Sequence, residues 1–134
     1  MQGRACTLFV PMAEEGLMGG PIVEGIARHY LEDIFNSAAA FPRPDTLLLG
    51  CTHFPLFRDS LQKIVGPGVC IVNPAATVAE TVELELAGRD LLRHAERAAK
   101  RHFMTTDNRE RFARTGSLFL GSPLAADAVE LVDL

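Results

Sequence analysis

Cysteine, threonine and histidine stand side by side in the segment Gly50 to Pro55, whose sequence is Gly-Cys-Thr-His-Phe-Pro. The continuous apolar run from Thr46 to Leu49 comes directly before it and predicts a strand buried on both faces, as in the parallel sheets of α/β proteins. In open α/β sheets, ligands bind outside the carboxyl ends of the strands. We therefore expect Cys51, Thr52 and His53 to lie at a binding site.

A helix predicted from Phe54 to Val65 follows this turn, with Pro55 in its first turn, where a missing N–H costs little. The free N–H groups and the positive dipole end at the start of a helix favour an anion such as a carboxylate. The same field stabilises a thiolate. Cys51 is then a candidate reactive thiolate, Thr52 a candidate carboxylate ligand and His53 a candidate proton donor or acceptor. A lone cysteine or histidine is more often a packing residue, so the argument depends on all three standing together at a strand end.

Composition excludes several classes of function. The formal net charge is −4, and acidic residues interrupt the basic stretch from Arg89 to Arg114, which argues against nucleic acid. No segment approaches the roughly 18 apolar residues of a membrane span, and the N-terminus lacks a signal peptide pattern. The three cysteines are an odd number, which favours free thiols in the cytoplasm. Cys51 and His53 offer only two ligands at no usual zinc spacing, so we expect no metal.

The rest of the chain alternates between segments with helical spacing of apolar residues and short apolar runs typical of strands. Apolar spacing predicts a helix over Ile22 to Phe35 and a longer one over Ala75 to His94, weakened at Gly88. A helix is expected after a cap at Thr106-Asp107-Asn108. Short apolar runs predict the remaining strands, which are Leu8 to Val10, Val69 to Val72, Lys100 to Thr105 and Ala128 to Leu134. This order indicates an α/β fold with a mainly parallel sheet flanked by helices.

The segment Leu47 to Leu56 resembles the signature of the glutamate racemases, in the aspartate/glutamate racemase superfamily, with Phe54 where that family typically has tyrosine. Ala5 to Gly16 resembles the family's Ala-Cys-Pro-x-Phe-Val-Pro-Leu-x-Glu segment, with Thr7 in place of proline. Weaker matches, in family order, are Ile71 to Ala75 with Glu80-Thr81, and Phe103 to Asp107 with Phe119 to Gly121. Together these matches cover nearly the whole chain.

The resemblance implies an enzyme that interconverts L- and D-glutamate without a cofactor and provides D-glutamate for peptidoglycan. In such enzymes two cysteines face opposite sides of the substrate Cα, and one removes the proton while the other delivers one. The resemblance makes Cys51 the second catalytic cysteine, Thr52 a substrate ligand, and His53 a substrate ligand that assists proton transfer at Cys51. Glu14 matches the acidic residue that tunes this thiol, and Glu15 is the alternative in a shifted register.

Two cysteines match no catalytic position of the family. We interpret Cys6 and Cys70 as buried packing residues, so the resemblance supplies no second thiol in this chain. Family members are roughly twice as long, and their Asp-Ser, Pro-Tyr-Gly and Cys-Asn-Thr motifs, the last with the first catalytic cysteine, are missing here. The chain therefore resembles the C-terminal half of a two-lobe racemase that binds glutamate in the cleft. Residues 1–74 correspond to most of the second lobe, and residues 75–134 to the C-terminal part of the first.

This interpretation predicts that the chain alone is inactive, and that it forms a homo-oligomer or needs the missing N-terminal half. Two alternatives stay open. The chain could come from a related aspartate or hydantoin racemase, although many of these have glutamate after Cys-Thr, so that His53 favours glutamate as the substrate. It could also be a non-catalytic carboxylate-binding or interaction module derived from the fold.

Overall fold

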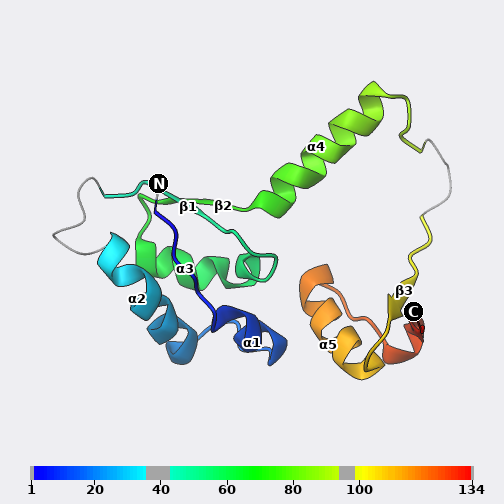
Figure 1. Cartoon of the computed structure of the whole chain (residues 1–134), viewed down its shortest axis with the longest axis horizontal. Helices are drawn as coiled ribbons and strands as arrows, with labels where there is room; N and C mark the ends of the chain where they lie inside the picture. Colours follow the sequence, from blue (N-terminus) through cyan, green and yellow to red (C-terminus); the bar gives the residue numbers. More distant parts are fainter. Residues whose placement is uncertain (1, 36–42, 94–98, 134) are drawn as a thin grey trace. The chain divides into compact units, whose positions relative to one another are not determined.

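The computed structural model describes residues 2–35, 43–93 and 99–133, and divides the chain into two units, Met1–Leu86 and Ala87–Leu134. Figure 1 shows the elements of each unit in chain order. The first unit contains α1 (Phe9–Glu14), α2 (Pro21–Phe35), β1 (Thr46–Leu48), the 3-10 helix η1 (Phe54–Phe57), α3 (Arg58–Val65), β2 (Cys70–Val72) and α4 (Pro74–Gly88), which ends just beyond the division. The second contains β3 (Phe103–Thr105), α5 (Arg109–Leu120), the 3-10 helix η2 (Ala126–Ala128) and β4 (Val129–Leu131). The predicted assignment of residues 1–74 and 75–134 to two lobes stays a prediction.

The helix α2 follows directly from its sequence. Its buried side chains recur at helical spacing, as Val23, Ala27, Tyr30, Leu31 and Ile34. These residues pack against the apolar face of α3, where Leu61, Ile64 and Val65 are buried. The predicted helices Ile22 to Phe35 and Phe54 to Val65 are thus confirmed, the second with its first turn wound as η1. The helix α3 ends at its C-cap residue Gly66, which takes a φ of 87°.

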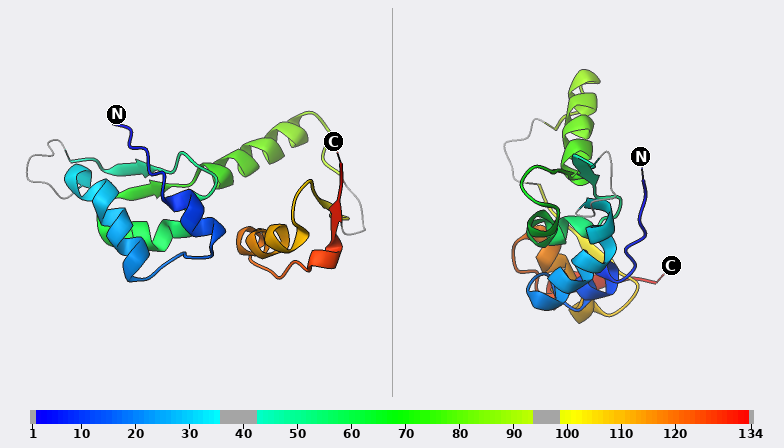
Figure 2. Two further views of the ribbon diagram at one scale, coloured as in Figure 1. Left: turned by 60° about the horizontal axis from the view of Figure 1, so that its bottom comes forward. Right: turned by 90° about the vertical axis from the view of Figure 1, so that its left-hand side faces the viewer.

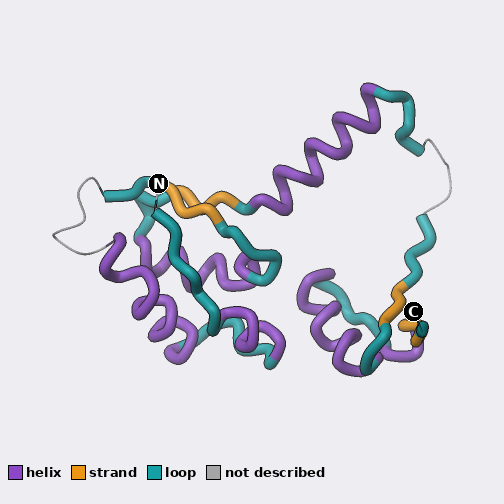
Figure 3. The backbone as a smooth tube through the Cα atoms, in the orientation of Figure 1, coloured by secondary structure: helices purple, strands orange, loops and turns teal. Residues whose placement is uncertain are grey.

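The strands β1 and β2 form a parallel pair in which Thr46 lies opposite Cys70, Leu47 opposite Ile71 and Leu48 opposite Val72. Figures 2 and 3 show both strands lying over α3 within the first unit. Because side chains alternate along a strand, Leu47 and Ile71 face the core, whereas Thr46, Leu48 and Cys70 are exposed. The expectation of a strand buried on both faces is therefore wrong for β1. Leu49, just after the strand, is buried.

The helix α1 replaces the strand predicted at Leu8 to Val10, and that prediction is wrong. The burial of Phe9, Met12 and Ala13 has helical rather than alternating spacing. Phe9 is the centre of an aromatic cluster, which consists of Phe9, Tyr30, Phe54 and Phe57. Its ring stacks on Phe57 at 4.9 Å between centroids and meets Phe54 at 5.4 Å and Tyr30 at 5.7 Å edge to face. This cluster ties α1 to α2 and η1.

The helix α4 begins after Asn73, whose side-chain Oδ1 accepts a hydrogen bond from the Ala75 N–H at 3.1 Å. It ends at Gly88, where the sequence predicts a weak point. The predicted continuation of the helix is wrong over Arg89 to Arg93, which are not helical, and His94 lies outside the described residues. None of the described helices is long and apolar enough to cross a membrane.

In the second unit, β3 and β4 pair in parallel, with Phe103 opposite Val129. Both lie within predicted strands. The predicted cap of the following helix is confirmed, because the Asn108 side chain accepts a hydrogen bond from the Arg111 N–H at 2.7 Å. The mixture of helices and parallel strands in both units confirms the α/β class.

Candidate active site

Cys51, Thr52 and His53 form the turn between β1 and η1. Leu49 extends the strand ladder by donating its N–H to the Val72 carbonyl at 3.1 Å, and the chain then leaves the sheet at Gly50. The turn closes when the Phe54 N–H donates to the Cys51 carbonyl at 3.2 Å. The strand, turn and helix thus follow one another as the sequence predicts, and the three polar side chains stand at the carboxyl end of β1.

Glu14 reaches this turn from α1, 39 residues earlier in the chain. Its Oε1 lies 3.1 Å from Nε2 of His53, and both side chains are largely buried, with exposed fractions of 28% and 21%. An ionised carboxylate only accepts hydrogen bonds, so Nε2 carries the proton of this contact. In the neutral imidazole Nδ1 is then an acceptor, and it lies 3.4 Å from the Thr52 hydroxyl. Glu14, His53 and Thr52 therefore form a chain of polar contacts beside Cys51.

The position of Glu14 is set by the packing of α1. Glu14 is the last residue of that helix, and the aromatic cluster fixes the helix through Phe9. The Tyr30 hydroxyl adds a polar anchor, because it accepts the Leu8 N–H at 3.2 Å. Glu15, the alternative in a shifted register, is exposed just beyond the helix. The geometry thus favours Glu14 as the partner of His53.

Sequence reasoning missed Tyr30, which holds α1 through its hydroxyl. Its helical spacing marked it only as a core residue of α2, and nothing in a single sequence shows which backbone its hydroxyl meets. The neighbouring Thr7 hydroxyl also lies 3.4 Å from the Tyr30 hydroxyl. Tyr30 therefore helps to place Glu14 without belonging to the polar chain itself.

The three thiols have different surroundings, and all are free. Cys51 is half-buried in the turn. Cys6 is buried, as expected, and its thiol donates to the Arg4 carbonyl at 3.6 Å. Burial raises the pKa of the Cys6 thiol, and the Arg4 charge opposes this effect. Cys70 is exposed, so the expectation of a packing residue is wrong there, because its side chain projects from the face of β2 that points away from the core.

A cysteine beside a hydroxyl and an oriented imidazole can move a proton next to a bound carboxylate. The carboxylate of Glu14 holds the imidazole in one orientation, which is the usual way a proton-transfer histidine is positioned. The same residues do not make a metal centre, and the described part of the chain contains no group of three or more His, Cys, Asp or Glu side chains able to hold a metal ion.

No family model matches the chain. The glutamate racemase of Chlorobaculum tepidum is 38% identical over 131 residues, which is 98% of this chain and 46% of that protein. The crystal structure of the Thermus thermophilus glutamate racemase with β-chloro-D-alanine superposes with a TM-score of 0.80 at 35% identity, over 98% of this chain and 47% of that one. The Francisella tularensis glutamate racemase with D-glutamate gives 0.79 at 30% identity, over 97% of this chain and 46% of that one.

The fold and these similarities identify the chain as a homologue of amino-acid racemases. The relatives that it matches in both sequence and fold are glutamate racemases, and the resemblance predicted from the Gly-Cys-Thr-His segment is confirmed. The chain spans about half the length of the relatives it matches, corresponding to their C-terminal half.

Proposed function

We propose that this chain provides the C-terminal part of a glutamate racemase, with Cys51 as one of two thiols that interconvert L- and D-glutamate without a cofactor. The observation that carries the proposal is the contact between Glu14 and His53 beside Cys51, in a chain that matches glutamate racemases over 98% of its length. The product would be D-glutamate for peptidoglycan synthesis. The three free thiols fit a cytoplasmic enzyme.

In this mechanism the Cys51 thiolate takes the proton from the Cα of one enantiomer, and the bonding electron pair stays on the substrate as a carbanion. A second thiol then gives a proton to the opposite face of Cα, and the roles reverse in the other direction. Neither Cys6, buried in the core, nor Cys70, on the sheet, stands in the turn of Cys51, so the proposal takes the second thiol from outside this chain.

The neighbours of Cys51 would have separate tasks. Thr52 would bind the substrate carboxylate through its backbone N–H and hydroxyl. His53 would contact the substrate and exchange a proton with Cys51, and Glu14 would hold the imidazole in place through the 3.1 Å contact. Preorganised donors around the carboxylate stabilise the carbanion-like transition state, and in enzymes one such donor contributes about 3 kcal/mol.

Glutamate is the proposed substrate rather than aspartate or a hydantoin. The relatives that match this chain are glutamate racemases, and the one from Francisella tularensis was solved with D-glutamate. His53 after Cys-Thr supports the same choice. Racemisation rates measured with L-glutamate and with L-aspartate separate these two substrates.

The test is a chimaeric enzyme in which this chain replaces the matched segment of the Chlorobaculum tepidum glutamate racemase. We expect the chimaera to convert L-glutamate to D-glutamate, measured by chiral chromatography, and to exchange the Cα proton for deuterium in D2O. The 134-residue chain alone should do neither. Cys51→Ser should abolish turnover, whereas the matched variant Cys70→Ser, at an exposed thiol of the same unit, should keep it.

Glu14→Gln tests the polar chain separately, because glutamine keeps the size of the side chain and loses its charge. We expect kcat to fall and KM to change little, since Glu14 acts through His53 rather than on the substrate. A folded chimaera that stays active with Cys51→Ser would refute the proposed role of Cys51. Turnover by the isolated chain would refute the requirement for a second thiol from outside it.

A further inference from the structure

The helix α1 is short, so the contacts at its two ends matter for the position of Glu14. It has six residues, far fewer than an isolated helix needs to be stable in water. Glu14 is its last residue, so any sliding or turning of α1 moves the carboxylate relative to His53. A shift by one residue corresponds to about 1.5 Å along the helix axis and about 100° around it, which is enough to break the 3.1 Å contact.

The beginning of α1 is held by α2 rather than by a cap of its own. Leu8, the N-cap residue, has an apolar side chain that cannot cap the helix. Its N–H donates instead to the Tyr30 hydroxyl at 3.2 Å, and the Thr7 hydroxyl lies 3.4 Å from the same oxygen. Tyr30 is only 9% exposed, so moving its hydroxyl away from these partners would leave a largely buried polar group without a hydrogen bond.

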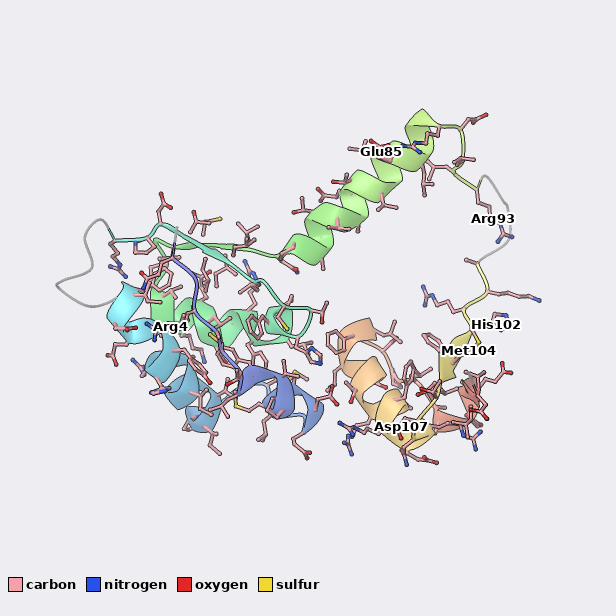
Figure 4. All side chains as sticks on the ribbon, in the orientation of Figure 1. Arg4, Glu85, Arg93, His102, Met104 and Asp107 are labelled. Atoms are coloured by element: carbon pink, nitrogen blue, oxygen red, sulfur yellow. The ribbon has the colours of Figure 1, made fainter. Side chains whose placement is uncertain are left out.

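The segment that leads into α1 also touches α2 farther from the helix, at Arg4 (Figure 4). The Arg4 Nη2 lies 2.7 Å from the Asp33 carboxylate. These two side chains are 36% and 61% exposed, and ion pairs at such positions contribute little because water and salt screen them. The hydroxyl of Tyr30 is therefore the firmer link between α2 and the beginning of α1.

The end of α1 is closed by its own backbone. The Gly16 N–H donates to the Ala13 carbonyl at 2.9 Å, and the Leu17 N–H donates to the Met12 carbonyl at 2.8 Å. This pair of hydrogen bonds is a Schellman motif, which requires a residue in the left-handed conformation. Gly16 takes a φ of 78°, and a Cβ there would have none of the described atoms within 4 Å. The space around Gly16 therefore admits a side chain, and only the backbone conformation opposes one.

We propose that Tyr30 and Gly16 are positioning residues for proton transfer at Cys51. Tyr30 fixes where α1 begins and Gly16 fixes where it ends, so that the Glu14 carboxylate stays in contact with His53. The aromatic cluster packs α1 on the core, but apolar packing is non-directional, whereas a hydrogen bond holds two atoms at one distance. The proposal rests on the proposed function, in which His53 exchanges a proton with Cys51.

The test uses the chimaeric racemase with Tyr30→Phe or Gly16→Ala. Phenylalanine keeps the ring and its contact with Phe9 and removes only the hydroxyl, and Leu8 is 46% exposed, so water can accept its N–H. Each variant should lower kcat about three- to tenfold, a loss of the size that one hydrogen bond or one strained residue produces, with KM little changed. Gly16→Asn should restore most of the loss, because asparagine tolerates the left-handed conformation.

A double-variant cycle with Glu14→Gln separates positioning from a general loss of stability. If Tyr30 acts through Glu14, Tyr30→Phe should lower kcat by less than about twofold further once Glu14→Gln is present. The control is Ile34→Val, in the same helix as Tyr30 and 8% exposed. It removes one buried methylene and costs about as much stability as one hydrogen bond, yet it should leave kcat nearly unchanged.

The contact itself can be followed in the 134-residue chain by NMR of isotope-labelled histidine. A hydrogen bond to a carboxylate slows the exchange of an imidazole N–H with water, so His53 should give an Nε2–H resonance, assigned by its loss in His53→Gln. Tyr30→Phe and Gly16→Ala should speed this exchange about tenfold, whereas Gly16→Asn and Ile34→Val should leave it close to that of the unchanged chain.

An equal loss of kcat in Ile34→Val, or losses that add to that of Glu14→Gln, would overturn the proposal. A Gly16→Asn variant as slow as Gly16→Ala would overturn the part assigned to Gly16. An active chimaera that neither Tyr30→Phe nor Gly16→Ala affects would overturn the proposal and leave the proposed function standing. An inactive chimaera would refute the proposed function, and exchange of the His53 proton that still responds as expected would support the positioning of Glu14.

Discussion

Replacing Phe9 by alanine removes the ring that joins α1 to the rest of the first unit. The ring is 1% exposed and contacts three others at centroid distances of 4.9 to 5.7 Å. Truncating a buried phenylalanine to alanine costs about 3–5 kcal/mol, of which each aromatic pair accounts for about 0.5–1.5 kcal/mol. Since α1 carries Glu14, the same change should separate Glu14 from His53.

The assay is urea denaturation followed by tyrosine fluorescence. The chain contains one tyrosine and no tryptophan, so Tyr30, which touches the Phe9 ring, is the only strong intrinsic fluorophore. With a slope of about 1 kcal/mol per M of urea, Phe9→Ala should lower the midpoint by about 3–5 M or abolish the native baseline. Phe9→Leu, which keeps apolar volume, should cost about 1.5 kcal/mol and give a measurable transition.

The control is Ile22→Ala on α2, an exposed position in the same unit that the same fluorophore reports, and it should change stability by less than about 0.5 kcal/mol. A loss below about 1 kcal/mol in Phe9→Ala would refute the reasoning, because α1 would then be held by something other than the aromatic cluster.

Three further predictions use other features of the chain. Ellman's reagent should modify exposed Cys70 first, half-buried Cys51 next and buried Cys6 last, as followed by mass spectrometry. Burial raises the pKa of the Cys6 thiol, so the unfolded state loses this proton at a lower pH than the folded state does. The free energy of unfolding should therefore fall as pH rises above about 8.5. Urea midpoints measured across this pH range should lack this part of the decline in Cys6→Ala. Asn108→Ala removes the cap of α5 and should cost about 1 kcal/mol, read from faster hydrogen exchange in that helix. Gly66→Ala forces a side chain onto a φ of 87° and should cost about 1–3 kcal/mol by Tyr30 fluorescence.

Patterns within a short segment, such as apolar spacing, a capping residue or a glycine, correctly predicted several helices and their ends. The apolar spacing from Ile22 to Phe35 marked α2, and Asn108 and Gly88 marked the beginning of α5 and the end of α4. The helix α1 was not predictable in this way, because the continuous apolar run before Pro11 is only three residues long. Its helical spacing becomes visible only when Met12 and Ala13 are seen to be buried together with Phe9. The burial of a strand face depends on what lies above it, so the composition of β1 could not reveal that Leu48 is exposed.

The candidate site also has one part that the neighbouring sequence predicts and one part that it does not. The turn with Cys51, Thr52 and His53 follows from an apolar run, a glycine and a helix start, all within a few residues. The contact between Glu14 and His53 spans 39 residues, and no spacing rule connects them. Only the family resemblance pointed to Glu14, and it left Glu15 open. The packing of Phe9 in the aromatic cluster decides between the two, since it sets the rotation of α1 about its axis.

The polar chain of Glu14, His53 and Thr52 is held by contacts within the first unit. Glu14 and His53 are held by α1 and η1, which pack into the core of the first unit through Phe9, Phe54 and Phe57. The proposed mechanism, in contrast, takes its second thiol from outside this chain. A segment that supplies this thiol would therefore meet Cys51 with its histidine already oriented, so that it would complete a site that is preorganised on one side.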